Sequence, residues 1–201
     1  MNLRAECYED RRFSPDEPRG ADLRDCRFVR CDFTDTAWSE ATLSGCTFTE
    51  CRFWAADLNG LSAEGCGFLG CDFRGATALL QAVLRDCRLT GSSFGEAKLP
   101  GLEIDGGDWS LTSLRGVDLR RKKLAGLRLR EADLSLCNLE QADLRGADLR
   151  QVLLAGAKVR GADLRGANLE GVDLGQLDLT GVKLDLDGAA ALARSLGAVL
   201  D

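Results

Sequence analysis

A large apolar side chain recurs at every fifth residue through most of this chain, and the residue two positions before it is usually small. Residues 142–151 read ADLRGADLRQ, and residues 162–171 read ADLRGANLEG. A period of five matches neither the 3.6-residue turn of an α-helix nor the two-residue alternation of a strand. A short fixed period predicts a solenoid, in which each unit buries its apolar side chains by stacking on its neighbours.

We call the large apolar residue the centre of each unit. The centres of the first half are Leu23, Phe28, Phe33, Trp38, Leu43, Phe48, Phe53, Leu58, Ala63, Phe68 and Phe73. Those of the second half are Leu84, Leu89, Phe94, Leu99, Ile104, Trp109, Leu114, Leu119, Leu124, Leu129, Leu134, Leu139, Leu144, Leu149, Leu154, Val159, Leu164, Leu169, Leu174, Leu179 and Leu184. The phase slips by one residue near 77–83, which predicts one inserted residue at a bulge or a wider corner.

Glycine often follows two residues after a centre, as at Gly101 and Gly146. If a four-residue turn starts at each centre, this glycine is the third residue of the turn. A type II turn requires positive φ at that position, and glycine adopts it without steric strain. The pattern therefore predicts a corner after every centre.

The cysteines indicate the length of one coil. They form two series with a spacing of twenty residues: Cys26, Cys46 and Cys66, and Cys31, Cys51 and Cys71. Twenty residues are four units, so we expect a square coil with one unit on each side. Successive coils would then pair as parallel strands about 4.8 Å apart. Each cysteine series would form one inward-facing column, in which a thiol replaces the usual alanine as a small buried group.

Composition argues against several classes of function. The chain has nine cysteines, no histidine and a net charge of −6, from 26 basic and 32 acidic residues. Without histidine there is no Ser-His or Cys-His pair, so no enzyme activity, metal site or cofactor is expected. The acidic balance disfavours nucleic acid as a ligand. No segment has the apolar length of a membrane span, and the start does not resemble a signal peptide, so a cytoplasmic location is expected.

The two ends depart from the period. We expect residues 1–20 to form an irregular first coil and loop, residues 21–184 the repeat domain, and residues 185–201 a helix and tail. Asp187 is a suitable N-cap and Gly197 a suitable stop for that helix. The helix could merely cover the open core, or it could also pair with its copy in a second chain, which its apolar residues favour. The candidate interface residues are Leu184, Leu186, Leu192, Leu196 and Val199.

One basic run interrupts the pattern. Residues 120–123 read RRKK and place Lys122 at a small inward position, where a buried charge is costly. Either the ammonium group reaches solvent or the corner is distorted. A solvated bulge is the simpler interpretation, and a basic patch that contacts an acidic partner is the functional one.

The A(D/N)LXX motif of residues 21–184 resembles that of the pentapeptide-repeat family, whose members are right-handed quadrilateral parallel β-helices. The turn around Leu99-Pro100-Gly101 and the ending Leu184-Asp185-Leu186 before an Ala-rich helix resemble the mycobacterial MfpA and Qnr groups of that family. This resemblance implies a homodimer that binds DNA gyrase, imitates DNA and protects the enzyme from fluoroquinolones. It also implies a partner-binding role for acidic residues near the dimer centre, which are Asp143, Asp148, Asp163, Asp173 and Asp178.

Two functions of different classes therefore remain open. One is a DNA-mimicking protein that modulates gyrase, with no nucleic acid, membrane or small-molecule ligand of its own. The other is a scaffold that binds an unrelated protein. A continuous anionic stripe along the rod would favour the first, and a patchwork of both charges would favour the second.

Overall fold

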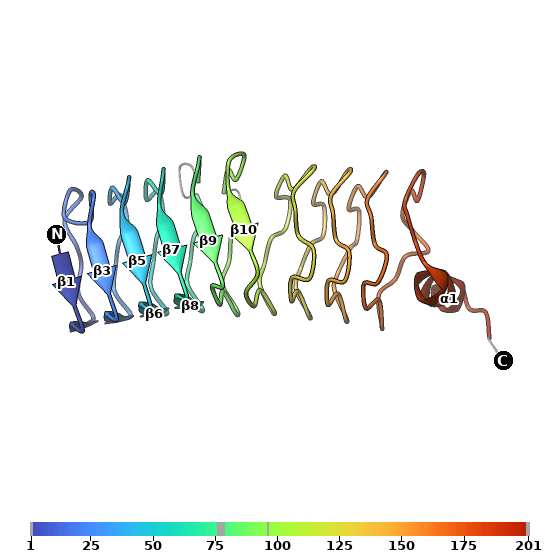
Figure 1. The fold of residues 1–201 in the computed structure, drawn as a ribbon, viewed down its shortest axis with the longest axis horizontal. Coiled ribbons are helices and arrows are strands. Elements are labelled where there is room, and N and C mark those ends of the chain that lie inside the picture. The colour runs from blue at the N-terminus through green and yellow to red at the C-terminus, as the bar shows by residue number, and fades with distance from the viewer. Residues whose placement is uncertain (1, 76–78, 96, 200–201) are drawn as a thin grey trace.

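The computed structural model describes residues 2–75, 79–95 and 97–199 of the 201-residue chain. They form a rod, with the N-terminus at one end and a short helix near the C-terminus at the other (Figure 1). The rod is a parallel β-solenoid, so the predicted all-β solenoid with a short C-terminal helix is confirmed.

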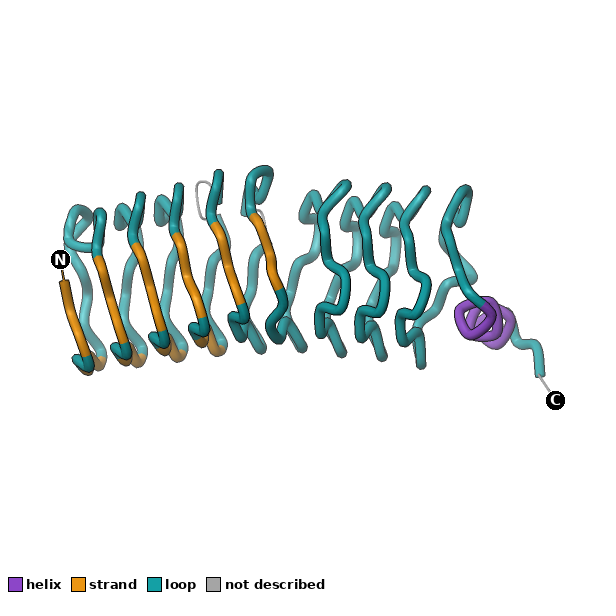
Figure 2. The backbone as a smooth tube through the Cα atoms, viewed as in Figure 1, coloured by secondary structure: helices purple, strands orange, loops and turns teal. Residues whose placement is uncertain are grey.

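Ten three-residue strands occur in the described part of the chain, all before residue 106, and one helix follows (Figure 2). They are β1 (Asn2–Arg4), β2 (Cys7–Glu9), β3 (Asp22–Arg24), β4 (Arg27–Val29), β5 (Thr42–Ser44), β6 (Thr47–Thr49), β7 (Ser62–Glu64), β8 (Gly67–Leu69), β9 (Val83–Arg85), β10 (Glu103–Asp105) and α1 (Leu186–Ser195). One parallel sheet has the order β1-β3-β5-β7-β9-β10 and the other has the order β2-β4-β6-β8. The two sheets are two sides of the solenoid.

Strand register confirms the coil length. Leu23 pairs with Leu43 and Phe28 with Phe48, an offset of twenty residues. Between β7 and β9 the offset is 21, because Ala63 pairs with Leu84. The inserted residue lies between the buried centres Phe73 and Leu79, which are six positions apart. Residues 77 and 78 of the predicted slip lie outside the described residues.

The second half of the rod has the same coil but hardly any extended strand. Single-residue bridges such as Asp143↔Asp163 join its coils. Four-residue turns explain the difference, since the amide of each small residue donates to the carbonyl of the preceding centre. Ala142 donates to Leu139 at 3.0 Å and Ala147 to Leu144 at 3.1 Å. A turn on every side leaves about one residue free for pairing, so strands occur on two sides of the first half, and single-residue bridges join the coils elsewhere.

Large side chains stack in columns inside the rod. Phe28, Phe48 and Phe68 lie face to face, with ring centroids 4.7 and 4.9 Å apart. Phe33 and Phe53 belong to the neighbouring column and stack at 5.1 Å. Such offset aromatic pairs stabilise the core beyond the burial of their area. Nearly all the predicted centres are buried, and the exceptions Ile104, Leu179 and Leu184 are half-buried.

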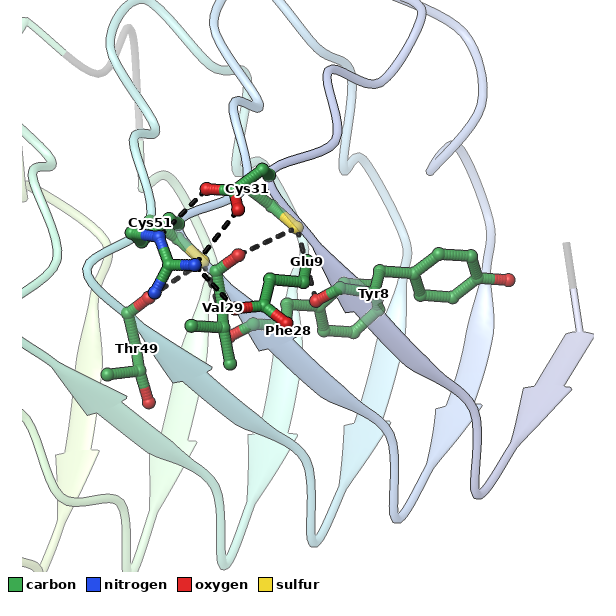
Figure 3. A network of polar contacts seen from close by, with 9 residues as sticks. Tyr8, Glu9, Phe28, Val29, Cys31, Thr49 and Cys51 are labelled. Atoms are coloured by element: carbon green, nitrogen blue, oxygen red, sulfur yellow. Dashed lines mark hydrogen bonds and ion pairs between the residues drawn. The ribbon is translucent and has the colours of Figure 1, made fainter.

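The two cysteine series form the predicted inward columns, and all nine cysteines of the chain are free thiols. Figure 3 shows how the thiols link coils: Cys51 donates to the carbonyls of Phe28 in the preceding coil and of Thr49, each at 3.5 Å. Cys31 makes the equivalent contact with Tyr8 at 3.6 Å. Burial raises the pKa of the Cys31 thiol, which keeps it protonated. These cysteines act as small apolar groups with a weak donor.

Most corners in the described chain have the predicted left-handed backbone two residues after the centre, although Gln176 after Leu174 does not. Gly146 has a φ of +66°, and non-glycine residues such as Asp25 (+55°) and Gln141 (+59°) adopt it as well. The prediction is wrong for Gly101, which is not in this region. Glycine is needed at this position because the backbones of two coils approach closely: a Cβ atom would lie 2.6 Å from the amide nitrogen of Gln81 in the preceding coil.

The N-terminal end of the core is covered by an arginine. The guanidinium of Arg11 lies over the rings of Tyr8 and Phe13, at 5.0 and 4.3 Å from their centroids. Its other side forms an ion pair with Glu17 from the proline-containing loop that follows. Cation–π contacts of this kind screen the first aromatic rings from water.

One interruption divides the rod, between residues 97–106 and residues 117–126, and we call it the seam. No backbone hydrogen bond within the described residues joins these two segments, although every comparable pair of coils nearby has several. Strand β10 is accordingly the last strand of its sheet. The coil after β10 is spaced more widely from it than neighbouring coils are elsewhere (Figure 2). On the other two sides the ladder continues through Arg88↔Asp108↔Arg128 and Ser93↔Ser113.

Candidate functional site

The five predicted partner-binding carboxylates are spread around the rod. Only Asp143 and Asp163 are neighbours, directly in register on the same side. A spacing of five residues moves a side chain to the next side of a four-sided coil. Asp148, Asp173 and Asp178 therefore lie on the three other sides. The structure does not assemble these residues into one acidic surface.

Three of these carboxylates bind an arginine two positions further along the chain. The guanidinium groups of Arg145, Arg150 and Arg165 each donate two hydrogen bonds, 2.6–2.9 Å long, to Asp143, Asp148 and Asp163 respectively. The hydrogen bond from the arginine lowers the pKa of each carboxyl, to about 2 for Asp163. These pairs form within one repeat because the positions directly before and after a centre both face outward on the same side of the coil. They leave these carboxylates charged but electrically compensated.

The two remaining carboxylates lie nearer the C-terminus. Asp178 accepts hydrogen bonds from the amide and hydroxyl of Thr180, which lower its pKa, and Arg160 of the preceding coil lies 3.7 Å away. Asp173 accepts from the amide of Gly175 at 2.9 Å. Within the described chain Asp173 forms no ion pair. Of the five, it presents the least compensated negative charge.

Charges of both signs follow one another in some outward columns, while others do not alternate: Asp143 and Asp163 are adjacent in one column, and Ser93 and Ser113 in another. One column runs Arg12, Asp32, Arg52, Asp72, and another runs Arg88, Asp108, Arg128, Asp148. In these two columns neighbouring coils present opposite charges at about strand spacing. This is a patchwork of both signs, not a continuous anionic stripe.

The C-terminal helix closes the last coil. Its N-cap is Asp185, whose side chain accepts from the amide of Gly188 at 2.9 Å, so the prediction of Asp187 is wrong. The same carboxylate accepts from the amide of Gly166 in the preceding coil, and these bonds lower its pKa. Because Asp185 fastens the helix to the solenoid as well as capping it, the helix begins two residues earlier than local sequence signals indicate.

The predicted interface residues divide into two groups. Leu184 and Leu192 are half-buried against the core of their own chain. Leu186, Leu196 and Val199 are exposed, at 88%, 66% and 88%. The first two therefore cover the open core, while the other three form the apolar surface available to a second molecule.

The inward lysine takes part in the seam. The ammonium group of Lys122 donates to the carbonyls of Pro100 at 3.1 Å and Leu102 at 2.6 Å, across the gap where the ladder is interrupted. Burial lowers the pKa of this amine. The turn itself is ordinary, since the amide of Lys122 donates to the carbonyl of Leu119 at 3.2 Å and Arg121 has the positive φ of the other corners. The corner is therefore not distorted, and the ammonium group reaches the open grooves beside the seam. The sequence signalled this site by a charge in an inward column, but it gave no sign of the broken ladder.

Open grooves flank the seam and the C-terminal helix. The groove volumes are about 1020 Å³ beside Arg121 and Lys122 on one side of the seam, 620 Å³ on the other, and 760 Å³ between α1 and the preceding coil. In the described part of the chain, no group of three or more Cys, Asp or Glu residues is placed to hold a metal ion. No helix in that part has the length and apolar character needed to cross a bilayer.

Comparison with known proteins identifies the repeat. The family model described as pentapeptide repeats matches residues 26–60, 38–75, 112–151 and 147–185, in eight copies. No match was found among curated protein sequences.

Solved structures reproduce the whole rod. Two trypsin-treated variants of QnrB1, described as a plasmid-mediated fluoroquinolone resistance protein, superpose with TM-scores of 0.87 and 0.86. They are 24% and 25% identical; the first match covers 100% of both chains, and the second covers 98% of this chain and 99% of that one. Full-length QnrB1 matches with a TM-score of 0.62 and 22% identity, over 98% of this chain and 100% of that one. On the family model and the coil geometry together, this chain belongs to the pentapeptide-repeat family.

Proposed function

We propose that this protein binds DNA gyrase in the cytoplasm as a homodimer and protects it from fluoroquinolones or similar gyrase poisons. The observation that carries the proposal is the end-to-end similarity to QnrB1 variants, one of them 25% identical over nearly the full length of both chains. Rods that superpose over nearly their whole length present a similar overall shape to a partner. The resistance function belongs to QnrB1, and its transfer to this chain is the hypothesis.

The C-terminal end is the proposed centre of the dimer. Leu186, Leu196 and Val199 are exposed apolar side chains within one short segment, and pairing with their copies would remove them from water. A two-fold interface of this kind is self-complementary. The two rods would then extend in opposite directions from α1.

Imitation of DNA is proposed only in a restricted form. Asp143 and Asp163 are adjacent on one side, and Asp173 lies close to the proposed dimer centre with no paired cation in the described chain. These carboxylates would contact the basic DNA-binding surface of gyrase. The alternating columns elsewhere would contribute little attraction, since neighbouring opposite charges largely cancel at distances beyond their own spacing, and salt screens the remainder beyond a Debye length of about 8–10 Å.

The alternating charges also favour the second candidate, a scaffold that binds an unrelated protein. Interfaces of ordinary proteins combine both charges around an apolar centre, and the C-terminal leucines supply such a centre. This alternative needs no topoisomerase and no drug.

Gyrase supercoiling with and without ciprofloxacin tests the proposal. We expect the wild-type protein to restore supercoiling in the presence of the drug. Asp163→Asn, Asp173→Asn and Asp178→Asn together should weaken this effect and gyrase binding while circular dichroism stays unchanged. The matched control is the triple change Asp22→Asn, Asp32→Asn and Asp57→Asn, far from α1, and it should retain the effect.

Salt dependence supplies a second measurement. Binding of gyrase to the wild-type rod should weaken as salt rises, because the proposed contacts are between exposed charges. Failure of the wild-type protein to bind or protect gyrase would refute the gyrase function. Protection that is insensitive to salt and to the C-terminal triple change would instead refute the role of these carboxylates.

A further inference from the structure

The seam has two strand edges whose backbone donors are unused. At other coils the amide of the equivalent centre bonds to the next coil: Leu124 to Asp143 at 2.8 Å and Leu144 to Asp163 at 2.9 Å. The amide of Ile104 in β10, at the same position, has no hydrogen-bond partner among the described residues. It therefore faces the gap unpaired.

Two further amides repeat this observation. Gly126 and Gly146 donate to the following coil at 2.8 and 3.0 Å, whereas Gly106, at the same position, has no described partner. On the opposite wall the amide of Lys123 also lacks one. Unpaired backbone groups at the edge of a sheet are ready to pair with another chain. Each side of the seam is thus a strand edge with unused hydrogen-bond donors.

The side chain of Lys122 takes the place of a missing backbone donor in the gap. Its ammonium group occupies the carbonyl of Leu102, which would otherwise accept from the next coil. An amine satisfies acceptors but offers nothing to the unpaired N–H groups. The need that remains is for acceptors, which are carbonyl and carboxylate oxygens.

The surroundings of the gap are basic in an acidic protein. The larger groove is lined by Lys98, Arg120, Arg121, Lys122 and Arg160 against Asp118 and Glu140. The smaller is lined by Arg85, Arg121, Lys122 and Lys123 against Glu103 and Asp105. Lys98, Arg121 and Lys123 form no salt bridge within the described chain, so their charges are uncompensated by a close acid.

We propose that the seam is a docking groove for an extended, acidic segment of a partner protein. The segment would add as a strand to the open edge of β10 and accept hydrogen bonds from Ile104, Gly106 and Lys123. Its carboxylates would lie against Arg121 and Lys123. Strand addition gives affinity through the backbone, and side chains at alternate positions give specificity. This docking groove is independent of the gyrase function.

A fluorescent octapeptide of alternating Glu and Val tests the groove by anisotropy. The wild-type protein should bind it, and Arg121→Gln with Lys123→Gln should weaken binding about tenfold, since two exposed charge contacts are lost. Arg115→Gln with Lys183→Gln changes the net charge equally on other coils and should leave affinity unchanged. Equal weakening by both pairs, or no binding by the wild type, overturns the proposal.

Two other probes separate strand addition from simple charge attraction. An octapeptide of alternating Glu and Pro keeps the charge and the carbonyl groups, but proline fixes φ near −65° and holds the chain out of the β conformation. Its carbonyls then cannot match the spacing of the seam amides, so it should bind at least about tenfold more weakly. A thymidine oligonucleotide of equal charge should also bind more weakly. Equal affinity for either probe refutes an acidic strand as the occupant.

Hydrogen exchange locates the bound peptide. The Glu-Val peptide should slow exchange of the amides of Ile104, Gly106 and Lys123, while the amides of residues 142–169 remain unchanged. Unaltered exchange at the three seam amides, with the peptide bound, would place it elsewhere and overturn the proposal.

Discussion

Replacing Phe48 by Ala tests whether the aromatic column stabilises the rod locally. Phe48 is fully buried and stacks on Phe28 and Phe68 at 4.7 and 4.9 Å. A Phe→Ala change in a core costs about 3–5 kcal/mol in total, and the loss of ring pairs, about 0.5–1.5 kcal/mol each, places a stacked ring toward the top of that range. With two stacked partners, we expect a loss at the upper end, about 5 kcal/mol. That is comparable with the whole stability of many domains, about 5–15 kcal/mol.

Because each coil contacts only its neighbours, the damage should not be uniform. Urea unfolding followed by circular dichroism measures the loss of stability, and hydrogen exchange measures where it occurs. We expect the coils up to residue 70 to exchange much faster and residues 112–169 to keep their protection. Thr47→Ala, on the outer surface beside it, is the control and should change stability by less than about 0.5 kcal/mol. A loss below about 2 kcal/mol, or faster exchange along the whole rod, would contradict this reasoning.

Three further predictions concern charge and assembly. Burial lowers the pKa of Lys122 below 10.5, so the unfolded chain binds the proton more tightly and wild-type stability should rise as pH increases from the folded pKa toward 10.5. The melting temperature of the wild type should therefore rise between pH 7 and pH 10 relative to that of Lys122→Met. Equal changes of melting temperature in the two proteins would contradict this prediction. The pKa of Asp163 falls from 3.8 to about 2, so its contribution is present above about pH 4 and disappears as pH falls through 2; Asp163→Asn should show a smaller loss of melting temperature between pH 5 and pH 2, and an unchanged loss would be the contrary result. Leu196→Asp should yield a monomer in light scattering without loss of circular dichroism, whereas a persistent dimer would exclude α1 as the interface.

The interior was predictable because every coil repeats the same physical requirement. Phe28 and Phe48 fill equivalent positions, so a count of five locates them without knowledge of their neighbours. The count of five fails at the inserted residue that precedes Leu79, and only the strand register shows where the period resumes. The N-cap was missed at Asp185 for a similar reason, because its second contact is to Gly166, nineteen residues earlier.

The candidate acidic surface was predicted less well. The carboxylates were chosen by their nearness to the C-terminus, but in a square coil only residues twenty apart stack on one side. Asp143 and Asp163 satisfy that condition, and the others do not. The seam could not be predicted from the local sequence. Lys122 marks an anomaly in the pattern, yet the missing hydrogen bonds are between segments about twenty residues apart, which no single repeat encodes.

The arginine over the first rings has a consequence for the size of the protein. In a solenoid each coil pairs with the next, so the geometry of the coil does not by itself limit the number of coils. An uncovered end would present aromatic rings and a free strand edge to any identical end, and growth could continue from molecule to molecule as a filament. Arg11 covers Tyr8 and Phe13 at one end, and α1 covers the last coil at the other. Arg11 and α1 thus cover the apolar core at the two ends of the described rod, whereas β1 is the edge strand of its sheet and offers its outer backbone groups for pairing.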